Sequence, residues 1–424
     1  MSARVPGRSL GSRFAAIPTY ILTLVALVLG ILSGGLFPDL LSPVAAGTRR
    51  LIDFIILLVP ALIFAALAPS TATLIRRGLA GRFAGSVIAW YAVSSLAAGL
   101  VGLLVAAVLF DIPLVVGTEG TAREIRGLLR GMFSADDVGV SLPLVAIAVA
   151  VVTAVVAVWV DRLYGVLRRI ERGMALTGAY VGYVILPLIL CFGIMIGVGF
   201  GATRGMGHYL TMIGYTALLC AVWWAFYVFV VIKLITKRPV TPLITEYYIP
   251  TALFAAGTQS SLATLPVNLA NAKKYGIRDE VADFVIPFGA VANMDASTLA
   301  YVAYAPFVTS YLFGLEMSWM VLFVAWPVVF LYSMAAPGLP AGLGTALWSS
   351  VLFASMLGLE DPIRGDFIAT WLALAGGIPD MFRSATNATG DGFVAVIFDS
   401  LFERYFERSP PPRLVAGSHG LGVT

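Results

Sequence analysis

Four polar residues near the end of the chain have the types and the spacing of a binding site. They lie three, four and four positions apart: Asp380, Arg383, Asn387 and Asp391. At ~100° per residue, these intervals place the four side chains within an arc of about 80° on one helix face. A guanidinium, two carboxylates and an amide on one face can bind a charged solute, cations or both.

The residues around this polar face are typical of a membrane helix. Residues 367–375 and 393–402 are mostly apolar, and Gly376 and Ser384 fall on the same predicted face. A charged side chain within a membrane helix costs roughly 2.5 kcal/mol or more, so it faces a site or a water-filled cavity. We therefore expect a ligand and ion site. The alternative is a buried ion pair that only holds helices together.

The composition excludes a soluble globular protein. Of the 424 residues, 59% are hydrophobic and only 12% are charged, whereas charged residues approach ~25% in soluble domains. The net charge of +4 does not indicate nucleic-acid binding.

The only histidines, His208 and His419, cannot form a histidine-based metal site, and Cys191 and Cys220 both lie in apolar segments. No cluster with an enzyme's nucleophile and base is evident, so we expect a polytopic membrane protein that is not an enzyme.

Apolar segments long enough to span a bilayer predict an all-α fold with eight transmembrane helices. They cover residues 17–37, 51–69, 84–110, 140–160, 177–200, 207–232, 283–312 and 366–400. The last two segments carry the polar motifs.

Two further stretches do not fit simple spans. Residues 243–272 hold T-Q-S-S-L-A-T-L-P at their centre, and residues 320–360 hold A-A-P-G-L-P-A-G-L-G. Proline and glycine free backbone groups that lipid cannot satisfy, so such backbone must contact protein or line a cavity. We interpret both stretches as re-entrant helical hairpins with buried tips, a kinked span being the alternative for each. A hairpin followed by a polar helix occurs twice, as expected of inverted repeats.

The distribution of lysine and arginine predicts the orientation. With both termini in the cytoplasm, most basic residues lie on the cytoplasmic side of a cell membrane. The first hairpin then enters from the cytoplasm and the second from outside. Residues 111–138 are expected to form an external loop, and residues 409–424 a disordered tail.

Cation ligands are predicted in the seventh span and the third. Asn293 and Asp295 place an amide and a carboxylate in an apolar helix, and Asp391 supplies a second carboxylate. Sodium requires several oxygen ligands of this kind, although Asp295 could instead be a neutral, protonated acid. Hydroxyls on one face of the third span could contribute: Tyr91, Ser94 and Ser95.

The solute is indicated by Arg383. A guanidinium within the membrane favours an anionic partner and suits a carboxylate. Asp380 could bind an ammonium group or simply pair with Arg383. Ser260 and Ser261, at the first hairpin tip, could bind a second carboxylate through a helix N-terminus.

At these residues the chain resembles the dicarboxylate/amino acid:cation symporter family, the glutamate transporter homologues. The motifs are R-R-L-I-D-F-I-I-L-L-V-P at 49–60, W-Y-A-V-S-S at 90–95, N-M-D-A-S at 293–297 and D-M-F-R-S-A-T-N-A-T-G-D at 380–391. The resemblance implies a homotrimer with an elevator mechanism. Each protomer would have a scaffold (about 17–69 and 140–200) and a mobile transport domain (about 84–110 and 207–400), with the second hairpin as outer gate.

The resemblance also implies residue roles. Arg383 would bind the side-chain carboxylate of the solute and Asp380 its amino group. The rest of the solute site would be Asn387, Ser297, Ser384, Ser260, Ser261 and Leu339. One sodium ion would be bound by Asp391, Gly289, Asn293 and Asn387. A second would be bound near Val291, Ser333, Met334 and Ala336, and a third by Asp295, Asn293, Tyr91, Ser94 and Ser95.

The pairing of Asp380 with Arg383 resembles the acidic amino acid branch of the family. Two positions depart from the family's pattern. Archaeal members have an arginine where this chain has Gln259, and eukaryotic members have one where this chain has Met381. Ala296 also replaces the family's glycine. We therefore expect sodium-coupled uptake of L-aspartate or L-glutamate. The alternatives are proton coupling, a C4-dicarboxylate as solute and, from another class, a channel or membrane receptor.

Overall fold

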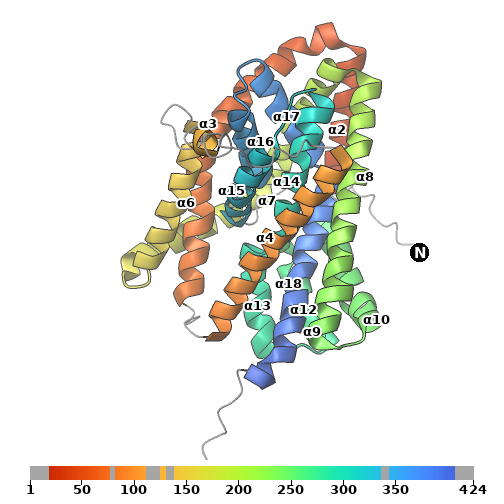
Figure 1. Cartoon of the computed structure of the whole chain (residues 1–424). Coiled ribbons are helices and arrows are strands. Elements are labelled where there is room, and N and C mark those ends of the chain that lie inside the picture. Colours follow the sequence, from red (N-terminus) through yellow and green to blue (C-terminus); the bar gives the residue numbers. More distant parts are fainter. Residues whose placement is uncertain (1–18, 77–81, 111–124, 130–137, 336–342, 406–424) are drawn as a thin grey trace, which may run out of the picture.

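A computed structural model of the protein describes residues 19–76, 82–110, 125–129, 138–335 and 343–405. These residues form helices and contain no strand (Figure 1). The first helices are α2 (Thr19–Leu36), α3 (Pro38–Arg76), α4 (Arg82–Phe110), α6 (Val138–Val156), α7 (Asp161–Phe200) and α8 (Ala202–Phe226). The next are η1 (Tyr227–Ile232), α9 (Lys233–Thr236), α10 (Val240–Pro242), η2 (Leu243–Tyr248), α11 (Ile249–Thr258), α12 (Ser261–Tyr275), α13 (Asp279–Ala292) and α14 (Asp295–Pro306). The last are η3 (Phe307–Leu312), α15 (Trp319–Ala335), α16 (Leu343–Met356), α17 (Ile363–Ala375) and α18 (Ile378–Tyr405).

The helices α2, α3, α6 and α7 pack on one another: α2 and α3 both contact α7, and α3 contacts α6. Small residues permit the close approach of α2 and α7. A Cβ atom added to Gly30 would lie 2.9 Å from the Cα of Gly193. Glycine at such crossings brings two backbones together, which is how membrane helices gain packing energy.

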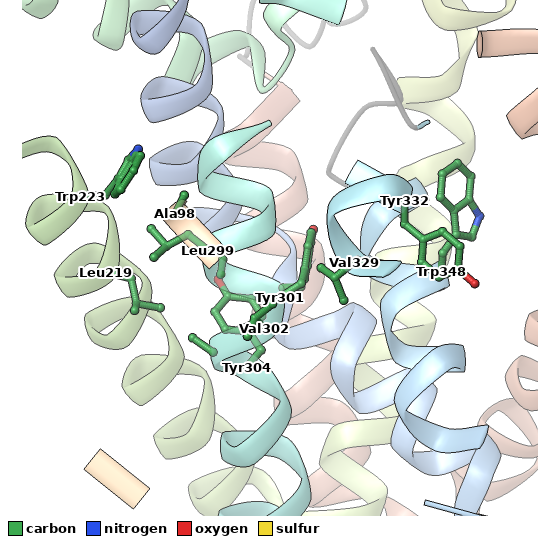
Figure 2. Packing of buried hydrophobic residues seen from close by; sticks show 14 of the residues in the cluster. Ala98, Leu219, Trp223, Leu299, Tyr301, Val302, Tyr304, Val329, Tyr332 and Trp348 are labelled. Carbon is green, nitrogen blue, oxygen red and sulfur yellow. The ribbon is translucent and has the colours of Figure 1, made fainter. Parts of the chain in front are cut away.

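The helix α14 lies at the centre of a second group of helices. It packs on α4, α8, α15 and α18, and every one of its residues is buried. Figure 2 shows Leu299, Tyr301, Val302 and Tyr304 of α14 between α8 on one side and the helices α15 and α16 on the other. After the polar residues of its first turn, the segment is apolar around its circumference rather than along one stripe, as expected of a helix buried on all sides.

The predicted eighth span is not one helix. It is divided at residues 376–377 into α17 and α18, so Gly376 does not share the polar helix face of α18 and that expectation was wrong. Gly377 has φ 68°, which glycine adopts without strain. Pro379 then favours a helix start, and Asp380 in the first turn suits the positive end of the helix dipole.

The predicted seventh span is also interrupted, at Asn293 and Met294, between α13 and α14. Asn293 has φ −88° and ψ 104°, which is extended backbone. The helix α14 begins with Asp295, so a carboxylate again lies at a helix N-terminus.

At the first predicted hairpin the structure has two helices, α11 and α12, that meet at Gln259 and Ser260. Gln259 has φ 52°, and the Ser260 side chain caps α12 by accepting a hydrogen bond from Ala263 N. The second hairpin has arms α15 and α16, but its tip, with Ala336 and Leu339, lies outside the described residues.

Several helices are longer than the predicted spans, above all α3 and α7, which extend beyond the apolar stretches at 51–69 and 177–200. Among the described residues, two continuous helical stretches are long and apolar enough to cross a membrane, Phe83–Phe110 and Ala202–Thr236. Five shorter apolar helices accompany them. The external loop predicted at 111–138 and the tail predicted at 409–424 lie largely or wholly outside the described residues.

Candidate ligand and ion site

The centre of the candidate site is a buried ion pair on the first turns of α18. Nη2 of Arg383 lies 2.8 Å from Oδ1 of Asp380, and it also donates to the carbonyl oxygen of Ala375 at 2.8 Å. The alternative that Asp380 pairs with Arg383 is therefore realised in this structure. Yet Oδ2 of Asp380 and Nε of Arg383 are buried without a hydrogen-bond partner among the described residues. Both groups keep unused capacity for a ligand.

The guanidinium of Arg383 lies over the ring of Tyr301, which stacks in turn on Trp371 and Phe353. Its Cζ atom lies 4.5 Å from the centroid of the Tyr301 ring, a cation–π contact that desolvation strengthens. The rings of Tyr301 and Trp371 are stacked at 6.5 Å, and those of Trp371 and Phe353 at 5.5 Å. The contact with Tyr301 restricts the orientation of the guanidinium plane.

Asn387 joins the polar face of α18 to the interrupted seventh span. Its Oδ1 accepts a hydrogen bond from Ala296 N at 2.8 Å, and its Nδ2 donates to Oγ of Ser297 at 3.2 Å. These contacts satisfy an otherwise unpaired amide in the first turn of α14. Predicted solute residues from two separate segments thus meet.

The predicted ligands of the first sodium ion also come together. Asn293 Nδ2 donates to Oδ1 of Asp391 at 3.0 Å and to the carbonyl oxygen of Asn387 at 3.3 Å. A Cβ atom on Gly289 would lie 2.5 Å from Oδ1 of Asp391, so only glycine allows this approach. Within the part of the chain that the structure describes, Oδ1 of Asn293 and Oδ2 of Asp391 are buried without a hydrogen-bond partner. Two such oxygens are a donor set suited to a hard cation.

The predicted third cation position is held together by hydroxyls. Ser94 and Ser95 of α4 donate to the two carboxylate oxygens of Asp295, at 2.5 and 2.6 Å. Serine hydroxyls within a helix often donate to a carbonyl oxygen of their own helix. Ser94 and Ser95 donate to Asp295 instead. Tyr91 instead donates to the carbonyl oxygen of Val285, at 3.1 Å.

The remaining predicted residues are less closely connected. Ser261 and Ser384 are buried, and Ser260 is used as a helix cap. Among the described residues predicted for the second sodium ion, Ser333 donates back to Val329 O at 2.8 Å, while Val291 and Met334 are half-buried. The described part of the chain therefore leaves that position incomplete.

A buried carboxylate lies outside the predicted site, near the end of α18. Asp399 is contacted by Arg238 at 2.5 Å and by Nε of Arg278 at 3.3 Å. These arginines flank the first hairpin in sequence, so one carboxylate ties both of its ends to α18. At the end of α12, Lys273 is half-buried, and a hydrogen bond to Asp283 raises its pKa.

Sequence reasoning missed residues that position the site from a distance. Tyr209 contacts the break between α17 and α18, Tyr301 lies beneath Arg383, and Asn268 donates to Ala388 O at 2.7 Å. No local pattern marks the two tyrosines. Asn268 alone had a signal, since it is an amide in an apolar hairpin arm.

With this geometry established, comparison with known proteins gives the family. The sequence model of a protein family, described as the sodium:dicarboxylate symporter family, matches residues 20–401 of the chain. The chain belongs to the sodium:dicarboxylate symporter family. Proteins of this family are membrane symporters rather than enzymes.

Individual relatives match shorter regions. The neutral amino acid transporter B(0) of Rattus norvegicus is 29% identical over 177 residues, which is 42% of this chain and 29% of that protein. The proton/sodium-glutamate symport protein of Bacillus caldotenax is 31% identical over 158 residues, which is 37% of this chain and 35% of that protein. The matched region thus spans about a third of these curated relatives.

Proposed function

We propose that this symporter takes up an acidic amino acid, L-aspartate or L-glutamate, together with sodium ions. The observation that carries the proposal is the buried Arg383–Asp380 pair, in which Nε of Arg383 and Oδ2 of Asp380 have no hydrogen-bond partner in the described parts of the chain. A solute with a carboxylate and an ammonium group complements both. Arg383 would bind the distal carboxylate and Asp380 the amino group.

We assign Asn387, Ser297, Ser261 and Ser384 to the rest of the solute site. The contact of Asn387 with Ser297 and the burial of Ser261 and Ser384 support this assignment. We propose that the tip of the second hairpin, with Leu339, closes over this site. A neutral amino acid that drew Asp380 to its ammonium group would leave the guanidinium of Arg383 without an anionic partner, which is costly in a buried site.

Sodium coupling is supported by the oxygen atoms around Asp391. Its Oδ2 and Oδ1 of Asn293 lack partners among the described residues, and a cation would satisfy both. A second ion would be bound near Ser333, Met334 and Ala336, and a third by Asp295 with Ser94 and Ser95. The sodium ions are transported substrates and bind together with the solute.

The proposed movement is that of an elevator. The helices α2, α3, α6 and α7 would form a static scaffold and the trimer contacts. The helices α4, α8 and α11 to α18 would carry the site across a cell membrane, with both termini in the cytoplasm. The packing of α14 on α4, α8, α15 and α18 supports treating these helices as one moving unit.

Uptake into liposomes tests the proposal. The purified protein is reconstituted, and entry of radiolabelled L-aspartate is followed under an inward sodium gradient or an inward proton gradient. Accumulation driven by sodium supports both solute and coupling. Accumulation of a C4-dicarboxylate but not of aspartate would contradict the solute assignment.

A second candidate is proton-coupled uptake of the same solute. It is favoured by Oδ2 of Asp380, which has no hydrogen-bond partner among the residues that the structure describes and could carry a proton. A relative is also named as a proton/sodium-glutamate symport protein. Accumulation under the proton gradient alone, without sodium, would favour this candidate.

A further inference from the structure

The break between α17 and α18 controls where the ion pair of the site lies. The carbonyl oxygen of Ala375, the last residue of α17, accepts a hydrogen bond from Arg383. Asp380 lies in the first turn of α18, just after the break. A change in the backbone at residues 376–378 would therefore shift the two charged groups relative to each other.

Two side chains from other elements hold this backbone. Tyr209 of α8 donates through its hydroxyl to Gly376 O at 3.3 Å, and the same hydroxyl accepts from Ile378 N at 3.1 Å. Gln259, at the tip of the first hairpin, donates from Nε2 to Gly377 O at 3.0 Å. Consecutive residues of the break are thus bonded from two sides, and both side chains are buried.

The energetic weight of the two contacts differs. Ile378 N is a donor in the first turn of α18, where the helix itself offers no partner, and Tyr209 supplies one. Gly377 O also accepts a hydrogen bond from Met381 N, at 3.2 Å, so it would keep one partner without Gln259. Loss of the tyrosine hydroxyl should therefore be the more damaging change.

Gln259 is itself held in an unusual conformation. Its φ of 52° is uncommon for a residue other than glycine, and it is the only glutamine in the chain. A left-handed backbone at the hairpin tip directs its amide at the break rather than along the hairpin. The tip and the break are 118 residues apart in sequence, so this contact couples the hairpin to the start of α18.

We infer that Tyr209 and Gln259 are positioning residues for solute binding, which hold the 376–378 backbone so that Asp380 and Arg383 fit an amino acid. The inference rests on the proposed function for its solute. The predicted sodium ligands Asp391 and Asp295 are further along α18 and on α14, so the two residues affect the solute more than sodium.

The test uses the full-length purified protein and changes that remove only hydrogen-bonding atoms: Tyr209→Phe, Gln259→Met and both together. Binding of L-aspartate is measured by calorimetry at saturating sodium. We expect Kd to rise roughly tenfold for Tyr209→Phe and roughly fivefold for Gln259→Met. The double change should give less than the product of the two, because both residues hold one segment. Tyr311→Phe, at an exposed tyrosine, is the matched control.

Two further readouts separate positioning from a purely structural role. Stabilisation by sodium alone, measured as the thermal shift without solute, should be unchanged in both variants. Hydrogen exchange of the Ile378 amide should become faster in Tyr209→Phe, and this measurement needs no solute. An unchanged aspartate Kd, or an equal loss of the sodium response, would overturn the inference.

The outcomes also distinguish this inference from the proposed function. If the unchanged protein binds no aspartate, the proposed solute is wrong, and hydrogen exchange then tests the inference without solute. Exchange of the Ile378 amide that is as slow in the variants as in the unchanged protein would overturn the inference.

Discussion

Replacement of Arg383 by methionine is the sharpest test of the proposed solute site. Arg383 is buried and donates two hydrogen bonds of 2.8 Å, one of them to Asp380. A charge-assisted hydrogen bond contributes about 1.5–3 kcal/mol. Because about 1.4 kcal/mol corresponds to a tenfold change in Kd, loss of even one such bond to the solute weakens binding roughly ten- to hundredfold.

The same change also affects stability, since it leaves Asp380 as an unpaired buried carboxylate. Removing one partner of a buried pair costs about 3–5 kcal/mol. The double variant Asp380→Asn with Arg383→Met removes the uncompensated charge, so it should recover most of the thermal midpoint but not the binding of aspartate. Arg204→Met, at an exposed arginine of α8, serves as the control.

Calorimetry with L-aspartate and with L-serine provides the measurement for these variants. We expect the aspartate Kd to rise at least tenfold in Arg383→Met, while binding of the neutral amino acid is retained or gained. If the double variant is as stable as the unchanged protein and binds aspartate equally well, the assignment of Arg383 to the solute carboxylate is refuted.

Three further predictions concern the other buried carboxylates. Asp391→Asn preserves size but removes the charge beside Asn293, so half-maximal thermal stabilisation should require roughly tenfold more sodium; an unaltered sodium titration would remove Asp391 from the ion site. Ser95→Ala deletes the 2.6 Å hydrogen bond to Asp295 and should lower the thermal midpoint, whereas an equal midpoint would mean that the hydroxyl contributes nothing. Asp399→Asn weakens the contacts that tie both ends of the first hairpin to α18 and should lower the thermal midpoint in detergent, and a loss no larger than that of the exposed control Asp39→Asn would contradict this role.

The polar face of α18 was predictable because charged side chains in an apolar chain avoid lipid and must contact protein, a ligand or water. The spacing of Asp380, Arg383, Asn387 and Asp391 fixes their common face, and the cost of charge in lipid turns that face toward protein. The structure accordingly places Asp380 with Arg383 and Asn387 with the seventh span. The division of the chain into a scaffold and a transport domain stays a prediction.

The hairpin assignment was predictable for the same reason. Gly, Pro and small polar residues in the middle of an apolar stretch mark backbone that lipid cannot accommodate. This identified the tip at Gln259 and Ser260 without any structural information. The ends of α3 and α7 were less predictable, because helix outside the apolar stretch has no hydropathy signal.

The class of protein, the polar helix face and the helix break at Gln259 and Ser260 therefore follow from the sequence alone, since burial of charge and of unpaired backbone is a local property of residue type. How the helices are held at their interruptions follows only from tertiary contacts. At the division of the last span, the backbone of residues 376–378 is bonded by Tyr209 and Gln259, which are far away in sequence. The position of the Arg383 guanidinium depends in the same way on the ring of Tyr301. Such contacts arise from the packing of whole helices, and no spacing along the chain encodes them.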